Sequence, residues 1–217
     1  MFTRRRLLVA SGAALSLTAL PFTADAAVVA GKDYLLVRPA VPMVGKPVII
    51  HDFFAYTCPH CLTFAPVLEE FVASLPKDGS VKVIPAPVAW NSTYEIFPRT
   101  YFAFEALGKL PELHMPFWEW VIKEEHDWKS TEDMSADVTK WVTGHGIGEA
   151  AWKRTLAGFS VVAKSRQASA LWQSYGVDST PSVGVAGKYL TAPHLAGTRR
   201  RTIDVLRELI ELAKQSA

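Results

Sequence analysis

The chain has 217 residues, of which 49% are hydrophobic and 20% charged, and its formal net charge is +2 at neutral pH. This length and apolar content suffice for a domain with a sizeable core. The nearly balanced charge does not provide the basic surface that nucleic-acid binding requires, so we exclude nucleic acid as a partner.

The first 26 residues have the organisation of a secretory signal peptide. Three arginines occupy positions 4–6, a mostly apolar run covers 7–20, and the triplet Ala24-Asp25-Ala26 follows. The run is too short to span a bilayer comfortably, which disfavours an uncleaved membrane helix. We expect cleavage after Ala26 and export to the periplasm, by the general secretory (Sec) route or by the twin-arginine route that paired arginines also suggest. Removal of 26 from 217 residues leaves 191, with a net charge near zero.

A buried strand followed by a helix is predicted around the cysteines. Residues 46–56 form a nearly continuous apolar run, as in a central strand covered on both faces. From Pro59 the apolar residues recur every three to four positions until Pro76, which predicts a helix.

The rest of the chain alternates between strand and helix patterns. A second strand is predicted over 81–88, and it is expected to lie at an edge of the sheet or to end early because its two prolines cannot donate ladder hydrogen bonds. Between 91 and 175 the pattern is helical and punctuated by glycine. Strands return as a hairpin over 182–185 and 188–190, and a last helix is predicted over about 198–213.

This order predicts an α/β fold with an inserted all-helical domain. We expect a sheet-containing domain built from 27–90 and 161–217, interrupted by a helical insertion over 91–160. Aromatic residues recur at helical spacing within the insertion, so we expect them to form its core. The arginine run at 199–201 is typical of a solvated helix face, and we assign it no role.

The only two cysteines form the motif Cys58-Pro59-His60-Cys61 at the predicted strand-to-helix junction. A bridge between them closes a loop of only a few residues and adds little stability, so redox chemistry explains the pair better than a structural role. Pro59 suits the first helical position, which makes Cys58 the N-cap. The N–H groups of His60 and Cys61, the helix dipole and a protonated His60 all favour a Cys58 thiolate and lower its pKa.

Cys61 lies one turn further along the predicted helix and is expected to be buried and protonated until it resolves a mixed disulfide. Stabilisation of the Cys58 thiolate favours the dithiol over the disulfide, so the disulfide is expected to be an oxidant. No cofactor other than this redox-active disulfide is expected.

The sequence resembles the DsbA family of the thioredoxin superfamily over essentially all of the mature chain. The shared features are Gly31-Lys32-Asp33-Tyr34, Asp52-Phe53-Phe54, the Cys-Pro-His-Cys motif, Thr180-Pro181 and Gly187-Lys188-Tyr189, all in the family's order. The resemblance implies the thioredoxin fold, a central mixed sheet flanked by helices, with a helical insertion. It also implies a periplasmic enzyme that donates its disulfide to unfolded exported polypeptides with free thiols.

The resemblance further implies roles for three residues outside the motif. Pro181 is expected to be cis and to lie against the disulfide, while the backbone of Thr180 pairs with an extended substrate. Asp52 is expected to be a buried carboxylate that relays the proton of Cys61. Reoxidation by a membrane, quinone-linked partner of the DsbB type is implied as well, and we expect a monomer.

The chain departs from the family pattern at two positions. Thr180 stands where many oxidases of the family carry valine, and threonine there occurs in isomerases and in some oxidases. Pro85 falls where a lysine near the buried acid often occurs. Substrate preference, reduction potential and the details of proton transfer therefore stay open at this point.

Two other functions compete with that of an oxidase. A reductase or isomerase would keep the pair reduced, but dimeric periplasmic isomerases carry an N-terminal association domain, and only about twenty residues separate Ala27 from the first confident strand. A metal-binding or copper-delivery protein would use Cys58, Cys61 and His60 as ligands. No second cysteine or histidine pair completes a tetrahedral set in the sequence.

Overall fold

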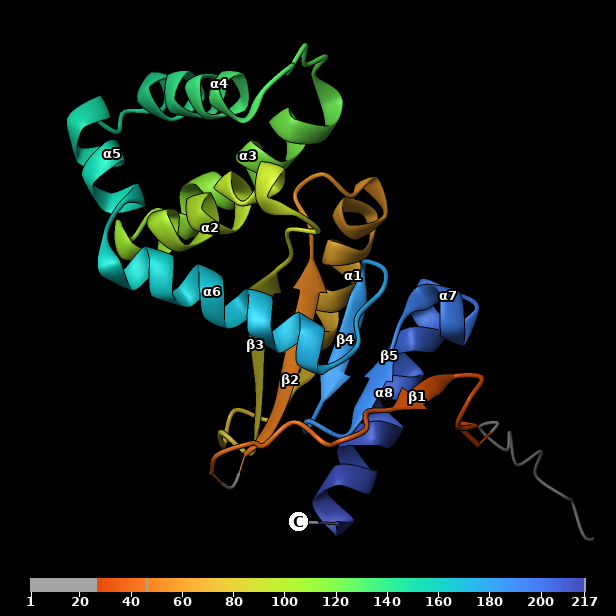
Figure 1. Ribbon diagram of the computed structural model, residues 1–217. Helices are drawn as coiled ribbons and strands as arrows, with labels where there is room; N and C mark the ends of the chain where they lie inside the picture. Colours follow the sequence, from red (N-terminus) through yellow and green to blue (C-terminus); the bar gives the residue numbers. More distant parts are fainter. Residues whose placement is uncertain (1–26, 46, 217) are drawn as a thin grey trace, which may run out of the picture.

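A five-stranded mixed sheet organises the chain in the computed structural model, which describes residues 27–45 and 47–216 (Figure 1). The expected signal peptide, residues 1–26, lies outside the described residues. The sheet order is β1-β5-β4-β2-β3, in which only β2 and β3 run parallel. The strands are β1 (Tyr34–Leu36), β2 (Val48–Phe54), β3 (Val81–Pro87), β4 (Ser182–Val185) and β5 (Tyr189–Thr191).

Strand β2 has the central position that its apolar run predicts. It pairs with β3 on one side and β4 on the other, and none of its seven residues is exposed. β3 forms an edge of the sheet, as its two prolines predict, because a proline in an edge strand can turn its missing donor away from the ladder. β4 and β5 form the predicted hairpin.

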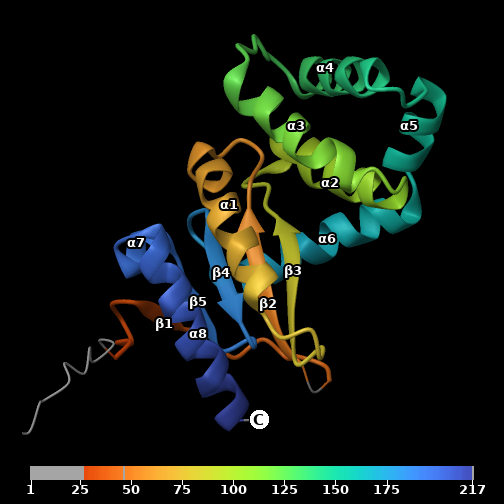
Figure 2. The same cartoon turned by 180° about the vertical axis from the view of Figure 1, so that it is seen from behind.

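Helices cover both faces of the sheet. α1 (Pro59–Ser74) and α8 (Arg199–Gln215) lie over one face, as Figure 2 shows, and bury a core with β2 and β4. Helix α6 (Phe159–Ser174) crosses the opposite face, where Tyr175 and Val177 pack against Phe53 (Figure 1). The result is the expected layered α/β core.

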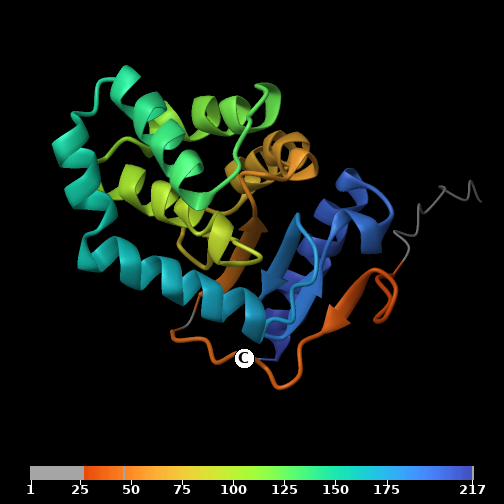
Figure 3. The same cartoon turned by 45° about the horizontal axis from the view of Figure 1, so that its top comes forward.

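A helical block lies between β3 and β4 in the chain and to one side of the sheet in space (Figure 3). It begins with the 3-10 turn η1 (Ser92–Tyr94) and comprises α2 (Ile96–Ala106), α3 (Leu110–Lys123), α4 (Thr131–Gly144) and α5 (Glu149–Leu156), after which α6 returns across the sheet. The expected aromatic core is confirmed, since Phe104, Phe117 and Trp152 are fully buried at its centre. Tyr56 and Cys61 belong to the same core, so the block continues directly into the redox motif.

Two short elements had no residue range predicted from the sequence. β1 has three residues and pairs with β5, but Leu35 and Leu36 are 41% and 46% exposed, so no alternation marks it as a strand. α7 (Pro193–Ala196) has a single turn. Within the described ranges, no helix is both long and apolar enough to cross a membrane.

Candidate active site

The redox motif lies where β2 passes into α1. Cys58 is the N-cap of α1, with extended backbone angles (φ −103°, ψ 109°), and its Sγ accepts a hydrogen bond from the N–H of Cys61 at 3.4 Å. Pro59 is the first helical residue. The predicted cap geometry is therefore confirmed, and it places the Cys58 sulfur at the positive end of the helix.

The two sulfur atoms occupy different environments and are not bonded to each other in this structure. Cys58 is partly buried, whereas Cys61 is only 2% exposed. A hydrogen bond from the Cys61 side chain lowers the pKa of Cys58 to about 5, with further bonds from the Thr180 side chain and from the N–H groups of Cys61 and His60 acting the same way. Burial raises the pKa of Cys61 well above its usual value.

The loop before β4 is distant from the motif in sequence but lies beside Cys58 in the folded chain. The Thr180–Pro181 peptide bond is cis, as the family resemblance implied. The thiol of Cys58 donates a hydrogen bond to the Thr180 carbonyl oxygen at 3.2 Å, across 122 positions of sequence. The backbone and the side chain of Thr180 thus both act on the Cys58 sulfur.

Asp52 and His51 lie on opposite faces of β2. Asp52 shares the face of Phe54, whose ring belongs to the same core cluster as Cys61, and burial raises the pKa of Asp52 to about 7. Pro85 is the register partner of Asp52 on β3, so no lysine occupies that neighbouring position. His51 is buried and its Nδ1 is 3.1 Å from the hydroxyl of Tyr175.

His60 is exposed. Among the causes that lower the pKa of Cys58, its contribution is the backbone N–H and not the charge of the imidazole. The ring instead forms part of the wall of a cavity beside the redox pair, together with Thr180 and Pro181.

The sequence did not predict the contact that anchors the motif to the helical block. The hydroxyl of Tyr56, two residues before Cys58, lies 2.7 Å from Nδ1 of His114 on α3. Burial lowers the pKa of His114 to about 4, which keeps the ring neutral and able to share one proton with the tyrosine. Because 58 positions separate the two residues, no local sequence pattern predicts that they form a pair.

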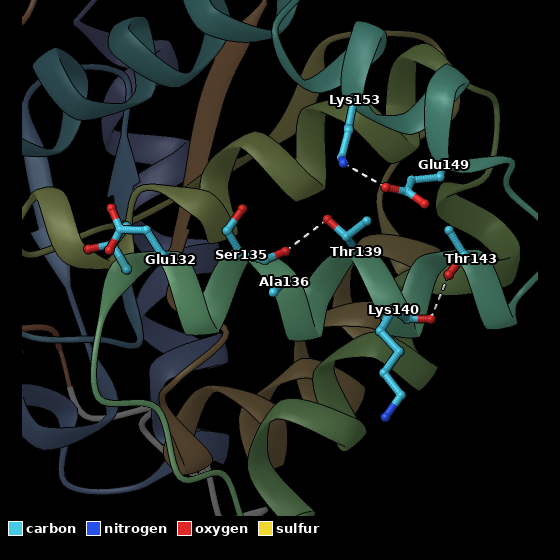
Figure 4. A pocket seen from close by; sticks show the side chains of 9 residues that line it. Glu132, Ser135, Ala136, Thr139, Lys140, Thr143, Glu149 and Lys153 are labelled. Atoms are coloured by element: carbon cyan, nitrogen blue, oxygen red, sulfur yellow. Dashed lines mark hydrogen bonds and ion pairs between the residues drawn. The ribbon is translucent and has the colours of Figure 1, made fainter.

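A second hollow, of about 700 Å³, lies on α4 and α5 and is separate from the redox pair (Figure 4). Four of its polar side chains have partners: Lys153 pairs with Glu149 at 2.6 Å, and the hydroxyls of Thr139 and Thr143 bond to helix carbonyls. Among residues 27–45 and 47–216, no group of three or more His, Cys, Asp or Glu side chains is placed to hold a metal ion.

Known proteins are similar to this chain in sequence and in fold. A sequence model described as Thioredoxin matches residues 44–205. The thiol:disulfide interchange protein DsbA of Bordetella parapertussis is 32% identical over 197 residues, which are 90% of this chain and 89% of that protein. The DsbA of Pseudomonas aeruginosa is 27% identical over 190 residues, 87% of each chain. Its crystal structure has the same fold, with a TM-score of 0.77 at 23% identity over 87% of this chain and 96% of that one.

Proposed function

This chain belongs to the DsbA family of thiol:disulfide interchange proteins, and from that premise we propose that it acts as an oxidant that gives its disulfide to polypeptides with free thiols. Thiol:disulfide oxidoreductase activity follows from the family and from the Cys58–Cys61 pair. The direction of electron flow is the part that we infer.

The asymmetry between the two cysteines is the observation that carries this proposal. The pKa of Cys58 falls from 9.0 to about 5, a shift of about four units, or roughly 5 kcal/mol at 1.36 kcal/mol per unit. Because Cys58 is partly exposed, solvent screening reduces this to about half. At about 30 mV per 1.4 kcal/mol, the stabilised thiolate raises the reduction potential of the pair by about 60 mV.

The reaction proceeds through two exchanges. A substrate thiolate attacks Sγ of Cys58, the Cys58–Cys61 bond breaks, and Cys61 leaves with the bonding electron pair and takes up a proton. A second substrate thiolate then attacks the substrate sulfur of the mixed disulfide, and Cys58 leaves as a thiolate. The substrate loses two electrons and gains a disulfide, and the protein is left as the dithiol.

The neighbouring residues position these steps. Thr180 and Pro181 hold an extended substrate against Cys58, with the Thr180 side chain adding a donor that valine lacks. Asp52, with a pKa near 7, exchanges the proton of Cys61 during reoxidation. Pro59 and His60 set the start of α1, so that its first N–H groups face the Cys58 sulfur.

We extend the proposal to the cellular setting of the reaction. Residues 1–26 act as a cleaved export signal, by the Sec or the twin-arginine route, and the mature protein works as a monomer in the periplasm. A membrane partner of the DsbB type, linked to quinone, restores the disulfide. The helical insertion over 91–160 forms a domain between two parts of the thioredoxin-like domain, 27–90 and 161–217.

The equilibrium of purified mature protein with glutathione buffers, read by thiol alkylation and mass, tests the direction of the reaction. An oxidant has a potential well above that of the glutathione couple. A value near about −270 mV, as for thioredoxin, contradicts the proposal and favours a reductase. The Cys58→Ser variant loses all turnover if the pair is the redox centre, whereas a metal-binding or other binding protein would keep its partner.

A further inference from the structure

Two separate parts of the chain line the cavity beside the redox pair. Its volume is about 450 Å³. His60 and Thr63 of α1, with Thr180 and Pro181, form one wall, and His60, Thr180 and Pro181 are residues of the redox centre. The other wall is the segment that joins β5 to α8, which lies at the same end of the sheet as the start of α1 (Figure 2). A polypeptide held at Thr180 therefore has this cavity within reach of its side chains.

The second wall carries positive charge. It contributes Pro193, His194, Gly197, Thr198 and Arg199, and no acidic side chain lines either wall. Arg199 is exposed, and in the part of the chain that the structure describes it takes part in no ion pair. Arg201 differs, because its guanidinium lies 3.9 Å from the carboxylate of Asp33.

The position of Arg199 opposes the local electrostatic preference of the helix. The first turn of α8 contains arginines and no acidic residue, although the start of a helix is already positive and favours anions. Residues that reduce local stability are expected at positions where they have a functional role. Arg200 and Arg201 lie in the same helical turn, but of the three arginines only Arg199 lines the cavity.

A glycine turn and a helix cap hold the backbone that carries His194 and Arg199. Gly197 adopts φ +89°, a conformation that L side chains rarely adopt, and this turns the chain from α7 into α8. The Thr198 side chain caps α8 by accepting the N–H of Arg201 at 3.0 Å, and the hydroxyl of Thr202 bonds to the Thr198 carbonyl at 2.8 Å. His194 and Arg199 are thus held on either side of this turn, at the cavity.

We propose that this cavity makes the enzyme select thiols that have an aspartate or glutamate nearby in the substrate polypeptide. Arg199 binds the substrate carboxylate as a charged donor, and the imidazole of His194 adds a hydrogen bond. The inference deepens the proposed function, on which it rests, by naming the class of polypeptide that the same redox centre prefers.

Two synthetic peptides test the selectivity. Each has two cysteines in one otherwise identical sequence, with glutamate or glutamine beside the first cysteine. Initial rates of peptide oxidation are measured with the oxidised mature protein at low ionic strength, and also with glutathione disulfide as an uncatalysed reference. A nearby carboxylate raises the pKa of the peptide thiol and slows the reference reaction, so a preference for glutamate must come from the protein. We expect the protein to oxidise the glutamate peptide about three to ten times faster after this correction, and about 0.3 M salt to remove most of the difference.

Matched variants locate the selectivity. Arg199→Gln and His194→Gln should each lower the glutamate-to-glutamine rate ratio, with the larger loss, to about one to two, in the arginine variant. Arg200→Gln is the control, because Arg200 has the same charge in the same helical turn but does not line the cavity, and it should keep the wild-type ratio. Equal corrected rates for the two peptides in the wild type, or an equal loss in Arg199→Gln and Arg200→Gln, overturn the inference. Failure to oxidise either peptide contradicts the proposed function itself.

Discussion

Replacement of Cys61 by alanine tests which interaction activates Cys58. The hydrogen bond from the Cys61 side chain is the largest cause of the low Cys58 pKa, and alanine removes it while keeping the backbone N–H that lies 3.4 Å from the Cys58 sulfur. Serine at the same position keeps a donor of similar size. The two variants therefore separate the side-chain bond from the helix N-terminus.

The expected size follows from the energy of one charge-assisted hydrogen bond. Such a bond contributes about 1.5–3 kcal/mol, or roughly one to two pKa units at 1.36 kcal/mol per unit. Cys58 is partly exposed, so screening by water favours the lower end of this range. We expect the pKa of Cys58 to rise from about 5 to about 6 in Cys61→Ala and to stay near 5 in Cys61→Ser.

Thiolate absorbance at 240 nm, followed from about pH 3 to pH 10, measures this pKa directly in both variants. An unchanged Cys58 pKa in Cys61→Ala, or an equal rise in both variants, refutes the assignment and leaves the helix N-terminus as the main cause. The remaining donors, from Thr180 and from the backbone N–H groups of His60 and Cys61, should keep the pKa below 9.0 even in the alanine variant.

The same shift makes the stability of the reduced protein depend on pH. The folded pKa of Cys58 lies below its unfolded value of 9.0, so the thiolate contribution to stability is fully present above pH 9. It is lost as the pH falls through about 5. The free energy of unfolding of the dithiol form should therefore rise with pH across this window relative to Cys58→Ser, as urea titrations at several pH values would measure.

Three further substitutions probe the surroundings of the motif. Asp52→Asn should stabilise the protein relative to the wild type by about 4 kcal/mol at pH 8 and by little at pH 4, because wild-type stability falls as pH rises towards the raised folded pKa of about 7. Gly184→Ala should lower the free energy of unfolding by at least about 2 kcal/mol, since its Cβ would overlap a tyrosine ring, whereas Gly144→Ala, with open space around it, should change it by less than about 0.5 kcal/mol. Tyr56→Phe should cost about 1–2 kcal/mol by leaving the partly buried His114 without its partner.

Urea or thermal unfolding measures all three effects, and each has an outcome that contradicts it. An Asp52→Asn difference that is the same at pH 4 and pH 8 would show that the carboxyl does not titrate with a raised pKa. Equal stability of the two glycine variants would mean that β4 moves to admit a methyl group. For Tyr56, a double-mutant cycle with His114→Phe should give a coupling energy of about 1 kcal/mol, and a coupling near zero contradicts the hydrogen bond.

Local chemistry explains why most of the redox site was predictable. The cap at Cys58, the first-turn proline and the buried position of Cys61 depend on neighbours within one helical turn, and the structure reproduces them. The central strand β2 and the edge strand β3 follow from apolar runs and from proline placement in the same way. The cis bond before Pro181 came from the family resemblance and not from spacing.

The features that sequence reasoning missed depend on contacts between distant segments or on very short elements. In the sequence, His114 has the pattern of any polar residue in an amphipathic helix, and its contact with Tyr56 forms only when α3 packs in the folded chain. Arg199 looks like part of a solvated run until the turn at Gly197 brings it to the cavity beside Pro181. Neither contact leaves a periodic signal, because the partners come from elements that meet only in the folded chain.

The helical block between β3 and β4 separates the two parts of the redox centre along the chain, and therefore in time during synthesis. Cys58 emerges from the ribosome 122 residues before Thr180, an interval of about 6–24 s at roughly 5–20 residues per second. For that time both thiols exist without the loop that binds the Cys58 sulfur and without the completed aromatic core around Cys61. The Cys58 sulfur thus gains its contacts with Thr180, and the redox centre is complete, only after the segment before β4 has been synthesised.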